Sequence, residues 1–103
     1  MMQNNKYTLF ILGGDDVGPV SIDITDDLTQ RLKQEASGRL SQSRFRLDKL
    51  IHLEHFSCPL AARKRASALR QASFQWLSSF ILSGNATWED LRDIQTHTPY
   101  YAA

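Results

Sequence analysis

The sequence has 103 residues, a formal net charge of +1, 42% apolar residues and 22% charged residues, which is typical of one soluble globular domain. These values exclude a disordered chain, a collagen-like repeat and an overall polycation. The charges are unevenly distributed: residues 1–27 carry one base and five acids, residues 28–75 carry ten bases and three acids, and residues 76–103 carry one base and three acids. A basic middle segment therefore lies between acidic ends, and such a charge asymmetry can guide a binding partner.

The beginning of the chain predicts a β-hairpin. Aromatic and β-branched residues over 7–12 indicate a strand that ends at Gly13-Gly14, and residues 13–18 have the glycines and aspartates of a turn. Strict alternation over 20–25 indicates a second strand with one apolar face. By this alternation alone, the opposite face is solvated, and its members are Ser21, Asp23 and Thr25.

A helix is predicted after the hairpin. Thr25 is expected to be its N-cap, followed by acidic residues at the positive end of the helix. Leu28, Leu32 and Ala36 recur at helical spacing until Gly38 ends the helix. Arg31 borders this apolar stripe and is expected to point towards the sheet.

The rest of the chain predicts a basic loop over 39–48, a strand over 49–56, and helices over about 60–72, 74–83 and 88–95. The inward residues expected of the first two of these helices are Ala62, Ala66, Leu69, Phe74, Leu77 and Ile81. The order ββαβααα predicts an α+β domain with a small three-stranded antiparallel sheet flanked by helices. One domain is expected over 1–103, with its core at about 7–95 and a tail at 96–103.

The single cysteine, Cys58, excludes an internal disulfide and a four-cysteine zinc site, and we expect it to be a small packing residue. The apolar run from Leu9 to Leu12 is too short for a signal-peptide core or a membrane span. We therefore expect a cytoplasmic protein that does not contact a membrane. His52 and Glu54 share one strand face, but two ligands are too few for a metal site, so a partly exposed pair is expected.

Arginine predominates among the basic residues of the middle segment. Its planar fork binds two oxygens at once, which suits phosphate groups, whereas the alternative interpretation is a solvated helix face. The residues expected to bind nucleic acid are Arg31, Arg39, Arg44, Arg46, Arg63, Lys64 and Arg70. Such a surface would bind the phosphate backbone rather than read the sequence, with DNA favoured over RNA.

The chain resembles the GIY-YIG nuclease superfamily, in particular its small single-domain bacterial members. The segments that carry the resemblance are 9–12, 21–25, 27–32, 37–39, 49–54, the helix with Ala62 and Leu69, and 84–91. The resemblance implies a metal-dependent phosphodiesterase site with tyrosines on the first two strands, an arginine on the first helix and a metal-binding glutamate on a later helix. Hydrolysis of a phosphodiester needs such a base, metal and cation.

Most of these site positions have lost the residue that the family uses. Phe10 and Ser21 replace the two tyrosines, and Asp23 replaces the glycine of the second motif. Glu35 stands where many members have histidine, and Ala66 stands at the position of the metal-binding glutamate. Only Arg31 matches, so the resemblance implies a catalytically degenerate site that needs no cofactor.

Three functions follow as hypotheses. The first is a non-catalytic GIY-YIG-like domain that binds nucleic acid. The second is an active endonuclease that uses magnesium or manganese at a rebuilt site of Ser21, Asp23, Arg31 and Glu35, with Asp23 and Glu35 as the metal ligands. The third is a protein-interaction or homodimer module that uses the apolar surplus of one helix, namely Phe74, Trp76, Phe80 and Ile81.

Overall fold

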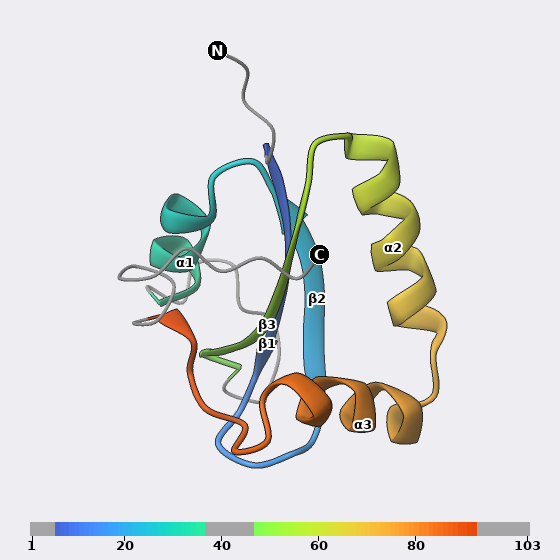
Figure 1. The fold of residues 1–103 in the computed structure, drawn as a ribbon. Helices are drawn as coiled ribbons and strands as arrows, with labels where there is room; N and C mark the ends of the chain where they lie inside the picture. Colours follow the sequence, from blue (N-terminus) through green and yellow to red (C-terminus); the bar gives the residue numbers. More distant parts are fainter. Residues whose placement is uncertain (1–5, 37–46, 93–103) are drawn as a thin grey trace.

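The structure, a computed structural model, describes residues 6–36 and 47–92. Its elements are β1 (Tyr7–Gly13), β2 (Val20–Thr25), α1 (Leu28–Ala36), β3 (Lys49–Phe56), α2 (Pro59–Gln71) and α3 (Phe74–Gly84). The strands form one antiparallel sheet in the order β2-β1-β3. Figure 1 shows α1 on one side of this sheet and α2 on the other. The predicted α+β class and three-stranded antiparallel sheet are confirmed.

The central strand β1 is buried on both faces because helices cover both sides of the sheet. Its side chains from Leu9 to Leu12 are at most 2% exposed. On one face, Leu9 and Ile11 pack against Ala66 and Leu69 of α2 and against residues of α3. A continuous apolar run, rather than an alternating one, is what a strand covered on both faces needs.

The second core lies between the sheet and α1. Phe10 and Leu12 of β1 pack there with Leu50 and Leu53 of β3, and the half-buried Leu28 and Leu32 of α1 cover them. The helical spacing of these two leucines therefore turns one side of α1 onto the sheet, as predicted.

An irregularity in β3 determines which residues face α2 and α3. The register pairs Ile11 with His52 and then Leu12 with Leu50, which leaves Ile51 as an extra residue in β3. A bulge of this kind lets consecutive side chains point to the same face. Ile51 accordingly joins the core under α2 and α3, and His52 contacts the ring of Phe80 from α3.

Several predicted element ends and side-chain positions are wrong. Asp27, not Thr25, caps α1: the Asp27 carboxylate accepts a hydrogen bond from the Gln30 amide at 3.1 Å, while the Thr25 hydroxyl accepts one from the Asp27 amide. Cys58 is exposed at the N-cap of α2 rather than packed. Phe74 is also exposed, whereas Leu77 and Ile81 are buried as expected.

The predicted helix over 88–95 does not begin at Trp88. Trp88 adopts a positive φ of 56°, and its buried indole donates a hydrogen bond to the Gly14 carbonyl at 3.0 Å. The buried Asn85 side chain donates to the carbonyls of Ile51 and Glu89. These tertiary bonds hold 88–91 in a non-helical path. Arg92 is helical, and residues 93–95 of the predicted helix lie outside the described residues. Over the described ranges, no helix is long and apolar enough to cross a membrane.

Gly13 is expected to be sensitive to substitution because β1 passes close to Trp88 there. A Cβ atom at Gly13 would lie 2.7 Å from Ile51 Cδ1 and 3.0 Å from Trp88 Cζ2. We expect Gly13→Ala to lower the free energy of unfolding by about 1–2 kcal/mol, since both neighbours are buried. Gly84→Ala is the matched control, because, apart from its chain neighbours and the backbone of its own helix, no atom of the described residues lies within 4 Å of the point where its Cβ would stand. Urea denaturation followed by circular dichroism measures both, and equal midpoints would contradict the expectation.

Candidate functional site

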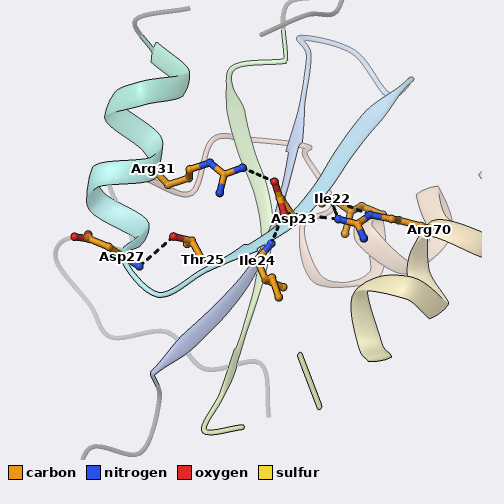
Figure 2. Close-up of polar contacts among 7 residues, drawn as sticks. All are labelled: Ile22, Asp23, Ile24, Thr25, Asp27, Arg31 and Arg70. Carbon is orange, nitrogen blue, oxygen red and sulfur yellow. Dashed lines mark hydrogen bonds and ion pairs between the residues drawn. The ribbon is translucent and has the colours of Figure 1, made fainter. Parts of the chain in front are cut away.

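Asp23 joins the two helices that lie on opposite faces of the sheet. Its carboxylate accepts a hydrogen bond from the Arg31 guanidinium of α1. The Arg70 guanidinium of α2 lies 3.7 Å from the other carboxylate oxygen. Figure 2 shows Asp23 between these two arginines. We call these three residues the Asp23 bridge.

The Asp23 bridge also covers the free edge of the sheet. Because β2 pairs only with β1, its outer edge carries unpaired backbone groups, which are a template for unwanted strand pairing. The Asp23 carboxylate accepts a hydrogen bond from the Ile24 amide at 2.9 Å, and Arg70 donates to the Ile22 carbonyl at 2.6 Å. This explains why a charged residue stands in the middle of β2, which alternation alone attributed to a solvated face.

Arg31 is held between the sheet and α1. Its backbone amide donates to the Asp27 carbonyl in the first turn of the helix. Its guanidinium carbon lies 5.4 Å from the centre of the buried Phe10 ring, within the range of a cation–π contact. Arg31 therefore points towards the sheet, as predicted, and the ring of Phe10 and the carboxylate of Asp23 together fix its position.

The structure brings together only some of the predicted site residues. Phe10, Asp23 and Arg31 are in contact, and Ser21 lies two residues from Asp23 on the same half-buried face of β2. Ala66 is separated from them by the sheet, because it packs with Leu9 and Ile11 in the core under α2. The backbone of Glu35 belongs to α1, but its side chain lies outside the described part of the structure.

The predicted nucleic-acid-binding residues divide into three groups. Arg31 and Arg70 already hold Asp23. Arg63 and Lys64 are exposed on α2, which contains no acidic residue between Pro59 and Gln71. Three others, Arg39, Arg44 and Arg46, lie outside the described residues.

A second charged group, of which the sequence predicted only the His52–Glu54 pair, lies on the face of the sheet covered by α2 and α3. The buried Glu54 carboxylate accepts two hydrogen bonds from the Arg65 guanidinium, both at 2.9 Å, and is also 2.9 Å from His52 Nε2. We call His52, Glu54 and Arg65 the Glu54 cluster. The expected partly exposed pair is thus wrong, because both His52 and Glu54 are buried.

The Glu54 cluster keeps its carboxylate ionised in a buried place. Burial by itself would raise the pKa of Glu54, but the hydrogen bonds from His52 and Arg65 and the charge of Arg65 outweigh it and lower the pKa to about 2. The signal in the sequence was the spacing of His52 and Glu54 on one strand face. Its partner Arg65 comes from α2, which only the tertiary structure could reveal.

The geometry of the Asp23 bridge is suited to holding an anion. A guanidinium group that donates hydrogen bonds to a carboxylate, as Arg31 does here, can bind phosphate oxygens in the same way, and a second cation nearby adds to the attraction. In this structure the chain's own Asp23 occupies that position. Within the described residues, no group of three or more histidine, cysteine, aspartate or glutamate side chains is arranged to hold a metal ion. Comparisons with family models, curated proteins and solved structures give no significant match to this chain.

Proposed function

We propose that this chain is a nucleic-acid-binding module on a GIY-YIG-like scaffold, and that it does not cut phosphodiester bonds. The basic outer surface of α2 is the observation that carries this proposal. Arg63 and Lys64 are exposed there, on a helix without acidic residues. Cations in such a setting attract a phosphate backbone and release its counterions, independently of sequence.

The Asp23 bridge supports the non-catalytic part of the proposal. Phosphodiester hydrolysis requires a general base beside the attacking water and a centre that stabilises the developing charge. Phe10 has no group that could accept a proton. The Asp23 carboxylate is engaged by Arg31 and by the Ile24 amide, so both the carboxylate and the cation of this region are committed to each other.

The experiment measures binding of short duplex DNA, single-stranded DNA and RNA by filter binding at about 50 mM and 200 mM salt. We expect the double variant Arg63→Ala/Lys64→Ala to bind several-fold more weakly and to reduce the salt slope by about two, because two phosphate contacts are lost. The control variant Lys6→Ala/Lys33→Ala removes the same charge from exposed positions outside α2. Equal weakening of both variants would mean that net charge alone, and not α2, determines binding.

Two other outcomes would overturn the proposal. If the protein does not bind at low salt, or if its affinity does not depend on salt, then α2 is not an electrostatic surface for nucleic acid. The same preparation is also incubated with supercoiled plasmid and magnesium or manganese, where we expect no nicking. Nicking that Asp23→Ala and Arg31→Ala both abolish would establish the endonuclease instead.

A further inference from the structure

Three side chains surround Phe80 of α3 on the side of the Glu54 cluster. The indole of Trp76 stacks on the Phe80 ring, with centroids 5.2 Å apart and planes inclined by 10°. The Arg65 guanidinium carbon lies 5.2 Å from the centre of the same ring, and the His52 ring meets its edge at 5.0 Å. Because Glu54 binds both Arg65 and His52, the base of this stack is fixed by charged hydrogen bonds.

Trp76 is the outer member of this stack. It is 50% exposed, whereas Phe80 is half-buried and the other tryptophan, Trp88, is only 3% exposed. Phe80 stacks on one face of the indole, which leaves the opposite face as the one that a ligand could contact. An exposed aromatic face of this kind, held rigid from behind, loses little conformational entropy when another ring stacks on it.

We propose that the outer face of Trp76 stacks with one base of a single-stranded nucleic acid. This inference rests on the proposed function and names its ligand class. Base stacking on an aromatic side chain combined with a cationic backbone track is the usual way to bind a single strand without reading its sequence. Lys64 is exposed next to Arg65 in α2, and Arg63 precedes it, so cations lie on the helix that supports the stack.

The size and charge of this surface favour a nucleic acid over a protein partner. A stable protein interface buries about 800 Å² on each side around an apolar centre. The large apolar side chains exposed on α2 and α3 are only Leu60, Phe74 and Trp76 among the described residues. Ile81, which the interface hypothesis included, is fully buried in the core, so it cannot contact a partner.

The test compares a short oligothymidylate with an abasic oligonucleotide of the same length, which has the same phosphates but no bases. We expect the protein to bind the oligothymidylate about tenfold more tightly, with quenching of tryptophan fluorescence. Trp76→Ala should bind both with equal affinity and show no quenching, since the remaining Trp88 is buried. Trp76→Phe should keep part of the preference because it keeps an aromatic face.

Phe74→Ala is the matched control, since Phe74 is 56% exposed on the same helix but lies outside the stack of Trp76 on Phe80. It should keep the full preference for bases. Equal, salt-dependent binding of both oligonucleotides by the unchanged protein would overturn the stacking inference and leave the proposed function standing. Binding of neither would overturn both. A dimer seen by light scattering that Trp76→Ala abolishes, together with no base preference, would assign the indole to a second copy of the chain.

Discussion

Replacing Glu54 by glutamine is expected to lower the free energy of unfolding by about 3 kcal/mol at pH 7. Glutamine has nearly the same shape, but it removes the negative charge that Arg65 and His52 surround. The Arg65 guanidinium would then keep only a neutral acceptor, and a charged group that loses its buried partner is costly. Urea denaturation monitored by circular dichroism measures the loss.

The difference in stability between the protein and the Glu54→Gln variant should depend on pH. The pKa of Glu54 falls from 4.5 to about 2 on folding, so its ionised form stabilises the protein fully above pH 4.5. That contribution, about 3 kcal/mol for a shift of this size, is lost as the pH falls through the folded-state pKa. The glutamine variant has no such group. We therefore expect the stabilities of the protein and of Glu54→Gln to differ at pH 7 and to converge towards pH 2.

Stability measured against pH for both the protein and Glu54→Gln separates the contribution of Glu54 from those of the other carboxylates. The pKa of Asp90 is also lowered: burial alone would raise it, but hydrogen bonds from Arg92 and from backbone amides prevail. That contribution is present in both proteins and cancels in the difference. Glu89→Gln removes an exposed carboxylate and serves as the control, with stability expected to change little. Parallel curves for the protein and Glu54→Gln would contradict the assigned role of the Glu54 cluster.

The sequence predicted the strands and the two longer helices because their patterns are local. The alternation over 20–25 records which side of β2 packs against the core, and the leucine spacing of α1 records which side of that helix does. Ser73 caps α3 by accepting a hydrogen bond from the Trp76 amide, a role that serine commonly has at this position. Such features depend only on neighbours within a few positions, so they can be inferred from one sequence.

The features that the sequence did not predict depend on contacts between distant residues. Trp88 stands in a stretch that looks like a helix start, yet its bond to Gly14 and the position of Asn85 impose a left-handed backbone. The strand that contains the bulge at Ile51 has no glycine or proline that would indicate a bulge in the sequence. The bulge directs His52 to α3, where the pair that looked exposed becomes buried.

Some contacts of the candidate site were predicted from the sequence, and others were not. The resemblance placed Arg31 beside Phe10 and Asp23, and these residues do meet. It also placed Ala66 with them, but Ala66 lies beyond the sheet. The stabilising role of Asp23 at the strand edge could not be predicted, because Arg70 reaches it from a helix 47 positions later in the chain than Asp23.

Replacing Asp23 by asparagine is expected to strengthen the binding of nucleic acid by about tenfold at low salt, because it removes the negative charge that pairs with the Arg31 and Arg70 guanidinium groups. Asparagine can still accept the hydrogen bond from the Ile24 amide, so the strand edge stays covered. The protein itself should lose only about 1 kcal/mol of stability, since the Asp23 side chain is 39% exposed. The salt slope should rise, since the Asp23 carboxylate no longer competes with phosphate for these two cations.

Asp27→Asn is the control for this experiment. It removes the same charge four residues away, and asparagine is as good an N-cap as aspartate, so α1 should remain intact. Asp27 does not hold either arginine side chain of the Asp23 bridge. If both variants bind DNA equally more tightly, the gain is a general effect of net charge. If only Asp23→Asn gains affinity and salt slope, the aspartate acts as an internal competitor for the phosphate position. This outcome would show that Asp23 limits the access of phosphate to the Arg31 guanidinium.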